Sequence, residues 1–159
     1  MSKLLTVDRV IATLMLICVV LMSFYIDYHN SHNVKLRTLP IECRSFDPDL
    51  IYAIKQIESN MNPNAKGDGN TSYGLMQIKY STAKHIGYKG KPNGLLDPQT
   101  NMKWGCLYLS KMLERTGDIN RALAAYNMGP NAEKKNQYIG KWEEHPYVGK
   151  IKKIWDKDK

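Results

Sequence analysis

The sequence is poor in the residues that build metal centres, with three cysteines and four histidines among 159 residues. Metal and thiol sites usually show short spacings such as C-x-x-C, and no such pattern occurs here. His29 and His32 lie close together in a polar stretch that favours a solvated linker, while His85 and His145 are isolated. The sequence therefore predicts neither a metal site nor a cofactor.

Acidic residues are also in the minority. From Thr38 onward there are 13 Asp or Glu against 19 Lys or Arg, so this part of the chain carries an excess of positive charge. A basic domain attracts anionic polymers. The basic residues are dispersed and accompany no DNA-binding motif, so nucleic acid is not the expected partner. The sequence also has no internal repeat and no low-complexity stretch.

Long hydrophobic runs are absent except for one, the seventeen uncharged residues from Val10 to Ile26. This length is at the short end of the roughly 17–25 residues that cross a membrane as a helix. Lys3 and Arg9 precede the run, which predicts a single-pass inner-membrane protein with the rest of the chain in the periplasm. A cleaved signal peptide is the alternative, but Ser23 to Tyr28 is bulky and makes a poor cleavage site. We therefore expect a retained anchor over residues 1–27 rather than secretion.

Residues 28–42 are rich in polar side chains and are expected to form a linker. The folded domain is expected over residues 43–159, which is long enough for one hydrophobic core. Cys18 lies in the apolar run, where a thiol behaves as a small hydrophobic group. Cys43 and Cys106 would both face an oxidising compartment, as either a disulfide or two buried free thiols.

The rest of the sequence favours helices, which are marked by their caps. Asp47 and Asp97 each precede a proline, the residue favoured at the first helical position. A small strand pair near Lys89 to Leu96 is the only β-structure indicated, so the expected fold is all-α, or α+β at most. The helices are expected over Asp49 to Asn60, from Pro98 towards Arg115, over Ile119 to Asn127 and from Pro146 onward.

Glu58 is the only acid in the body of the first of these helices. Leu50, Ile54 and Glu58 follow one another at a spacing of four residues, which places the acid on the apolar face. Burial raises the pKa of a carboxyl because it disfavours the charged form, and such a carboxyl can act as a general acid. From this helix alone, a structural carboxylate that caps or pairs is an equal alternative.

The segment after this helix is rich in turn residues, with Asn62-Pro63 followed by Gly67-Asp68-Gly69-Asn70. Such residues let the chain reverse and bring Gly74-Leu75-Met76-Gln77 back across Glu58. The apolar residues of this segment can pack, while its glutamine offers a donor and an acceptor to a bound hydroxyl or amide.

Several short blocks accompany Glu58 in one order and at consistent spacing. The blocks are Glu58-Ser59, Gly74-Leu75-Met76-Gln77-Ile78, Ser81-Thr82-Ala83, Asp97-Pro98-Gln99-Thr100-Asn101, Tyr108-Leu109 and the stretch from Ala122 to Pro130. In that order they resemble the soluble lytic transglycosylase (SLT) family, which is goose-lysozyme-like. The resemblance covers roughly Asp47 to Ile154 and implies a lysozyme-like SLT domain behind the N-terminal transmembrane helix.

The resemblance implies an enzyme that cleaves peptidoglycan between N-acetylmuramic acid and N-acetylglucosamine. Glu58 matches the family's catalytic acid, which protonates the glycosidic oxygen and then, as a carboxylate, takes the proton of the C6 hydroxyl of the muramyl residue. The implied product is a 1,6-anhydro sugar, and no water enters. Ordinary glycosidases need two carboxylates, whereas here an internal hydroxyl replaces water and one carboxyl suffices.

The resemblance also assigns substrate-binding positions. Met76 and Gln77 are expected to line the cleft, and Tyr126 and Asn127 to contact the sugar and the catalytic carboxyl. The string from Glu143 to Val148 looks like the family's E-T-R-x-Y-V segment and departs from it at the second and third residues. The whole expected set is Ser59, Ser72, Met76, Gln77, Tyr126, Asn127, Glu143 and Tyr147, with Ser72 standing for a serine that often precedes the glycine.

Two alternatives stay open. A lysozyme-type hydrolase of the same fold would need a second carboxylate to position water, for which Asp68 and Glu143 are the candidates. A non-catalytic peptidoglycan-binding scaffold is disfavoured by the intact Glu58. The expected partners are peptidoglycan glycan strands and the inner membrane, in the setting of wall turnover, a secretion or conjugation apparatus, or a phage.

Overall fold

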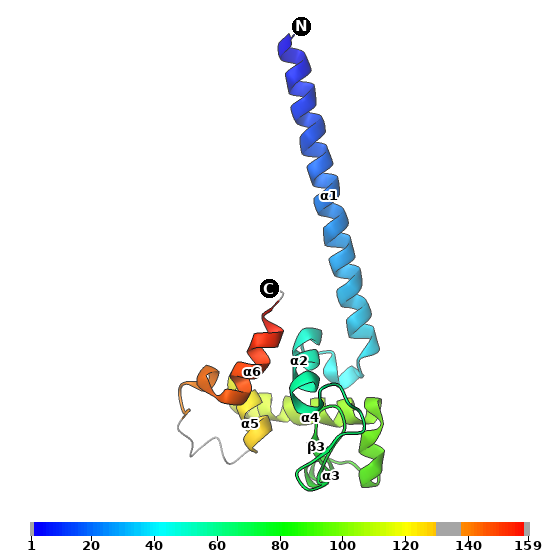
Figure 1. The fold of residues 1–159 in the computed structure, drawn as a ribbon, viewed down its shortest axis with the longest axis vertical. Coiled ribbons are helices and arrows are strands. Elements are labelled where there is room, and N and C mark those ends of the chain that lie inside the picture. The colour runs from blue at the N-terminus through cyan, green and yellow to red at the C-terminus, as the bar shows by residue number, and fades with distance from the viewer. Residues whose placement is uncertain (1, 130–137, 158–159) are drawn as a thin grey trace. The chain divides into compact units, whose positions relative to one another are not determined.

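The computed structural model describes residues 2–129 and 138–157, and the chain divides into two units (Figure 1). The first unit is a single helix, α1 (Ser2–Thr38). The second unit begins at Leu39 and contains all the other elements. Pro130, the last residue of the family-like blocks, lies outside the described residues.

The helix α1 contains the long apolar run. Its stretch Val10–Lys35 has a mean hydropathy of 2.3 and is long and apolar enough to cross a membrane. The apolar side chains from Val10 to Tyr28 are exposed, which is what a helix surrounded by lipid requires. The expected linker is helical as far as Thr38, so residues 28–38 continue α1 rather than forming an irregular segment. Their role as a tether stays a prediction.

The second unit begins before the boundary that the sequence predicted. Leu39 is only 8% exposed and packs into the hydrophobic core, as does Cys43 at the end of the short 3₁₀ helix η1 (Ile41–Cys43). The compact part of the chain therefore starts at Leu39 rather than at Cys43.

The four helices predicted for the second unit are present, and the short helix over Tyr80–His85 was not predicted. The side-chain oxygens of Asp47, Asp97 and Asp118 each accept a hydrogen bond from a backbone N–H two or three residues further on, at 2.8–2.9 Å. Each of these caps satisfies an N–H group that has no partner inside the helix. The helices are α2 (Pro48–Ser59), α3 (Tyr80–His85), α4 (Pro98–Thr116), α5 (Ile119–Met128) and α6 (Pro146–Trp155), with the 3₁₀ helices η2 (Pro92–Leu96) and η4 (Trp142–Glu144).

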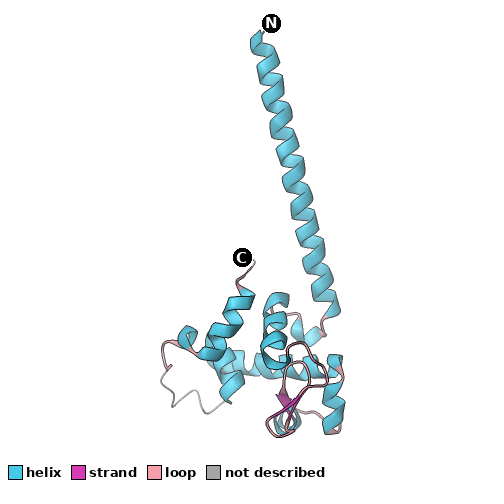
Figure 2. Cartoon of the chain, in the orientation of Figure 1, coloured by secondary structure: helices cyan, strands magenta, loops and turns pink. Residues whose placement is uncertain are grey.

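The β-structure lies elsewhere than predicted. The strand pair expected near Lys89 to Leu96 is absent from that described segment, which holds η2 instead. Three antiparallel strands of two residues each form a small sheet in the turn-rich segment before it (Figure 2). They are β1 (Lys66–Gly67), β2 (Ser72–Tyr73) and β3 (Ile78–Lys79). The second unit is otherwise helical, as the all-α expectation had it.

The core of the second unit joins α2, α4, α5 and α6. The residues Leu50, Ile54, Leu109, Leu123 and Ile151 are at most 2% exposed, and each such aliphatic side chain contributes about 1.5–3 kcal/mol on burial. Helix α6 runs antiparallel to α2, because the first turn of α6 contacts the last turn of α2 and the opposite ends also meet. This packing brings two distant parts of the sequence together beside Glu58.

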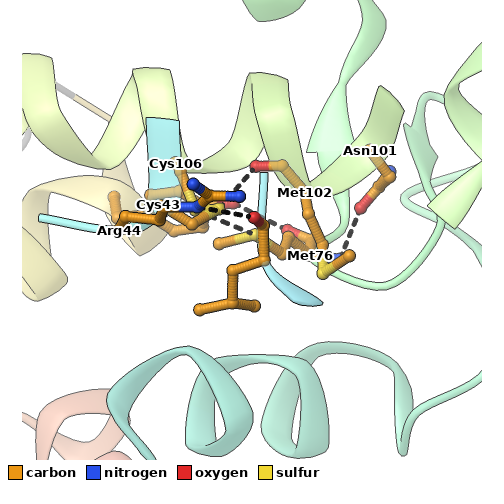
Figure 3. The surroundings of a disulfide bond; sticks show 8 residues. Cys43, Arg44, Met76, Asn101, Met102 and Cys106 are labelled. Carbon is orange, nitrogen blue, oxygen red and sulfur yellow. Dashed lines mark hydrogen bonds between the residues drawn. A yellow bond between two sulfur atoms is a disulfide. The ribbon is translucent and has the colours of Figure 1, made fainter. Parts of the chain in front are cut away.

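A disulfide joins Cys43 of η1 to Cys106 of α4 (Figure 3). Both cysteines are fully buried, and Cys18 on α1 is the free cysteine. Of the two alternatives left open by the sequence, the structure therefore has the bridged one. The bridge lies next to Met76, whose sulfur is 4.0 Å from Sγ of Cys106.

Candidate active site

A cavity of about 550 Å³ opens beside the last turn of α2. It is lined by residues from α2, the small sheet, α3, α4 and α5. Five of the sequence-predicted site residues line it, namely Glu58, Ser72, Gln77, Tyr126 and Asn127. The structure thus gathers at one cavity residues that are up to 69 positions apart in the sequence.

Glu58 is partly buried at the wall of this cavity. Burial raises the pKa of this carboxyl from its ordinary value of 4.5, because the charged form loses its water. A hydrogen bond from Tyr147 lowers the pKa by less, and the negative charge of Asp68 raises it further. The result is a carboxyl that holds its proton at a higher pH than an exposed glutamate does.

Tyr147 is the direct partner of Glu58. Its hydroxyl donates to Oε1 of Glu58 at 2.6 Å, from the first turn of α6. The opposite end of α6 is held by Trp155, whose Nε1 donates to Oδ2 of Asp47 at 2.8 Å. Tyr147 is 8% exposed, and burial raises the pKa of its phenol well above 10, so it stays a neutral donor.

Tyr126 closes another part of the cavity from α5. Its hydroxyl donates to the backbone carbonyl of Met76 at 2.8 Å. Its ring packs against that of Tyr108, with 5.2 Å between the ring centroids. Asn127, the next residue, is exposed and lines the cavity. The segment around Met76 and the end of α5 are therefore held together by one buried hydrogen bond.

Met76 itself corrects an expectation. Its side chain is fully buried and is not among the residues that line the cavity. It fills the space left by Gly105, where a side-chain carbon would come within 2.5 Å of the methionine sulfur. The residue acts through its backbone, because its carbonyl accepts from Tyr126 and its N–H donates to Asn101.

The small sheet supplies a polar wall to the cavity. Oδ2 of Asp68 accepts from the hydroxyl of Ser72 at 3.0 Å and lies 3.1 Å from Nζ of Lys79. These two donors lower the pKa of Asp68, with Lys79 as the larger cause. Gln77 adopts a left-handed backbone (φ 45°), and its amide nitrogen donates to the carbonyls of Gly74 and Ala65.

Besides Met76 and Tyr147, two more of the predicted residues, Ser59 and Glu143, are not among those that line the cavity. The hydroxyl of Ser59 donates to the carbonyl of Leu75 at 2.9 Å, which ties the end of α2 to the segment that crosses it. Glu143 is exposed in η4 and does not line the cavity. Ser59 therefore supports the site from behind, and the structure does not bring Glu143 to it.

Sequence reasoning assigned no role to Lys79 or Asn101. Lys79 lines the cavity, and Asn101 is a fully buried amide that bonds three backbone groups of the surrounding loops. Asn101 belongs to one of the family-like blocks, and this membership could have indicated its importance. Lys79 had no such signal, because its importance comes from the register of the sheet.

Comparison with known proteins identifies a family whose model matches most of this chain. A family model described as the transglycosylase SLT domain matches residues 41–147. The chain is 37% identical over 101 residues to a transglycosylase of Enterobacteria phage PRD1, covering 61% of this chain and 36% of the relative. It is 44% identical over 71 residues to the endo-type membrane-bound lytic murein transglycosylase A of Salmonella paratyphi B, covering 40% of this chain and 34% of that protein.

Solved structures give the same result. The 70 kDa soluble lytic transglycosylase of Escherichia coli is similar with a TM-score of 0.52 and 32% identity, covering 56% of this chain and 15% of that one. An inactive variant of the lytic transglycosylase Slt of Pseudomonas aeruginosa, with a glutamate changed to glutamine, has a TM-score of 0.53 and 28% identity, covering 65% and 17%. The chain spans about a third of the length of the curated relatives it matches.

Proposed function

The chain belongs to the transglycosylase SLT domain family, and from this premise we propose that it is a lytic transglycosylase that cleaves the MurNAc–GlcNAc bond of peptidoglycan. The observation that carries the proposal is Glu58, a partly buried carboxyl with a raised pKa at the wall of a 550 Å³ cavity. The relatives named above are transglycosylases, which supports the same reaction.

In the proposed reaction Glu58 acts twice. Its protonated carboxyl gives the proton to the glycosidic oxygen as the bond from that oxygen to C1 of the muramyl residue breaks. The C6 hydroxyl oxygen of the same residue then bonds to C1, and its proton returns to the Glu58 carboxylate. Glu58 ends in its starting state and no water is consumed, so the product end is a 1,6-anhydro sugar.

The neighbours of Glu58 suit this cycle. Burial keeps the proton available for the first step, while Tyr147 donates to the carboxylate that forms after it. Tyr126 and Asn127 line the cavity beside Glu58 and are proposed to contact the sugar. A hydrogen bond to a carboxylate is stronger than one between neutral groups, so Tyr147 favours the intermediate state.

A lysozyme-type hydrolase is the second candidate, because Asp68 lines the same cavity as Glu58. A general base for water needs a sufficiently basic oxygen. Lys79 and Ser72 bind Oδ2 of Asp68 and lower the pKa of this carboxyl, which makes its carboxylate a weaker base. Asp68 is therefore a poor base, and Glu143 is exposed and does not line the cavity. These points favour the transglycosylase over the hydrolase.

A non-catalytic scaffold is the third reading. Keeping a carboxyl partly buried opposes its ionisation and so lowers the stability of the folded domain at neutral pH. A binding-only protein gains nothing from such a residue. The proposal therefore assigns Glu58 to catalysis.

The product distinguishes these functions. Digestion of purified sacculi by the full chain should release muropeptides with 1,6-anhydro ends, about 18 mass units lighter than hydrolase products because no water is added. Mass spectrometry measures this difference directly. Glu58→Gln should lose at least about 10²–10⁴-fold of the activity, since the same group performs both proton transfers. Products with reducing ends would identify a hydrolase. If no glycan is released, the non-catalytic scaffold is the remaining function.

The helix α1 supports a proposal on location. Its exposed apolar stretch and the basic residues before it fit a single-pass anchor in the inner membrane, with the catalytic unit in the periplasm. Protease added to spheroplasts should then degrade the domain, and the full-length chain should sediment with membranes. Recovery of a shortened soluble protein would show that the segment is a cleaved signal.

A further inference from the structure

Among the cavity-lining residues that the structure describes, Lys79 is the one with a cationic side chain. The carboxyl groups among the same described residues are those of Glu58 and Asp68. With Glu58 protonated, the positive charge of Lys79 balances the negative charge of Asp68, so the described part of the cavity wall is close to neutral. Without Lys79 the wall would repel an anionic substrate.

The sheet holds Lys79 in a defined place. Lys79 of β3 pairs in register with Ser72 of β2, so the two side chains share one face of the sheet. Asp68 anchors both, because its Oδ2 accepts from the Ser72 hydroxyl at 3.0 Å and lies 3.1 Å from Nζ of Lys79. An ammonium group has three N–H donors, and the Lys79 side chain is 55% exposed, so donors remain for a ligand.

The substrate proposed for this site brings carboxylates close to the scissile bond. Muramic acid carries a lactyl ether whose carboxyl group is either free or extended by a peptide with carboxylates of its own. N-acetylglucosamine has neither. A cation at the wall of the cavity that holds Glu58 can therefore bind the carboxylate that distinguishes muramic acid from N-acetylglucosamine.

We propose that Lys79 is a specificity-determining residue, whose ammonium, held in place by Asp68, binds a carboxylate carried by the muramyl residue of the glycan strand. This inference rests on the proposed function, because it assumes peptidoglycan as the substrate. Asp68 is then a positioning residue for Lys79.

Binding without turnover tests the contact. The full chain carrying Glu58→Gln, in detergent, is sedimented with purified sacculi and with sacculi whose carboxyl groups have been converted to amides. Adding Lys79→Met should weaken binding to native sacculi about three- to tenfold, as expected of a half-exposed charge-assisted contact. The same substitution should leave binding to amidated sacculi unchanged. Equal loss on both, or no loss on native sacculi, would overturn the proposal.

A second set of variants separates direct contact from mere neutralisation of Asp68. If Lys79 acts only by cancelling that charge, Asp68→Asn together with Lys79→Met should bind native sacculi as well as Asp68→Asn alone. If Lys79 binds the substrate carboxylate, the double variant should stay about three- to tenfold weaker. Lys84→Met is the matched control, since Lys84 is exposed on the neighbouring α3 and does not line the cavity.

A further comparison identifies the source of the carboxylate. Strands stripped of peptide by an amidase keep the lactyl carboxylate. If Lys79→Met still weakens binding to these strands, the lactyl group is the ligand, and if it no longer does, the peptide is the ligand.

Failure of this inference can be distinguished from failure of the proposed function. If the wild-type chain releases no glycan product, the proposed function fails, while the sedimentation result still decides whether Lys79 binds the carboxylate. If products form and kcat/KM is unaffected by Lys79→Met, the specificity role alone fails.

Discussion

The hydroxyl of Tyr147 donates a 2.6 Å hydrogen bond to Oε1 of Glu58, across 89 residues of sequence. It joins the first turn of α6 to the last turn of α2, and the second end of α6 is fixed by the bond from Trp155 to Asp47. The orientation of the candidate catalytic carboxyl therefore depends on the C-terminal helix. The same bond also acts on acidity, because it favours the carboxylate while burial favours the protonated form.

Replacing Tyr147 by Phe should change the pH dependence of the reaction. The substitution removes a donor that lowers the pKa of Glu58, so this pKa should rise further. The protonated acid is needed for the first step, and the high-pH limb of kcat/KM should therefore move to higher pH. Loss of a hydrogen bond to a charged group costs about 1.5–3 kcal/mol, so kcat should fall roughly 10- to 100-fold. The measurement is the rate of digestion of sacculi between about pH 4 and pH 9. This range covers roughly the pKa values that perturbed glutamates adopt.

The matched control is Tyr52→Phe, because Tyr52 is on the same helix as Glu58 but is 47% exposed. It should leave both the rate and the pH profile unchanged. If Tyr147→Phe lowers the rate without moving the high-pH limb, the bond orients Glu58 but does not tune its acidity.

Asn101 should be among the residues most important for the stability of the site. It is fully buried, and its amide accepts from the N–H of Met76 and donates to the carbonyls of Tyr73 and Leu95, at 2.6–2.7 Å. Asn101→Ala would leave these three backbone groups unpaired in the interior, at about 1–3 kcal/mol each, so the free energy of unfolding should fall by roughly 3–5 kcal/mol. Urea denaturation measures the loss.

Gln99→Ala tests whether this effect belongs to Asn101 rather than to the helix. Gln99 is exposed in the first turn of the same α4, and its substitution should change stability by less than about 0.5 kcal/mol. A loss for Asn101→Ala that is no larger than for the control would contradict the role assigned to the buried amide.

The parts of the fold that the sequence predicted are those that local chemistry determines. The caps at Asp47 and Asp97 and the apolar face shared by Leu50, Ile54 and Glu58 need only neighbouring residues, and the structure has them as expected. The family expected from the ordered blocks is also confirmed, together with its helical, lysozyme-like fold. The three two-residue strands were missed because so short a strand has no measurable period.

The parts of the site that escaped prediction depend on tertiary packing. Met76 was expected at the cleft because it stands in a family-like block, yet the space beside Gly105 and the disulfide takes its side chain into the core. Lys79 reaches the cavity only through the register of β2 and β3. The resemblance placed Tyr147 at the site, but its hydrogen bond to Glu58 was not predicted, because no local pattern connects residues 89 positions apart.

The disulfide gives a prediction that is independent of activity. Thiol titration of the wild-type chain in denaturant, without reductant, should find one free thiol, that of Cys18. The bridge closes a loop of 63 residues, so changing both Cys43 and Cys106 to Ala should lower the free energy of unfolding by about 2–4 kcal/mol. Cys18→Ser should leave stability unchanged and remove the titratable thiol. Three free thiols in the wild type would rule the bridge out.

Glu58→Gln should stabilise the folded chain, and by an amount that depends on pH. Glu58 has a raised pKa in the folded protein, so above its ordinary value of 4.5 the folded state holds this proton more tightly than the unfolded state does. The free energy of unfolding therefore falls as pH rises from about that value through the folded pKa, and it stays lower above it. Below the ordinary pKa the carboxyl is neutral in both states, and this contribution to stability is fully present.

Glutamine keeps the shape of the side chain and an oxygen that can accept from Tyr147, but it carries no charge at any pH. The difference in free energy of unfolding between Glu58→Gln and wild type should therefore be near zero below the ordinary pKa, grow in favour of the variant as pH rises, and level off above the folded pKa. Urea denaturation at a series of pH values measures this difference, with the exposed Glu114→Gln as the control. A variant that is less stable than wild type at neutral pH would mean that the ionised carboxylate is favoured by its surroundings, and Glu58 would then lose its physical basis as a general acid. A stabilised variant that has lost activity would instead show one residue held in a state that favours catalysis over stability, as the proposed mechanism requires.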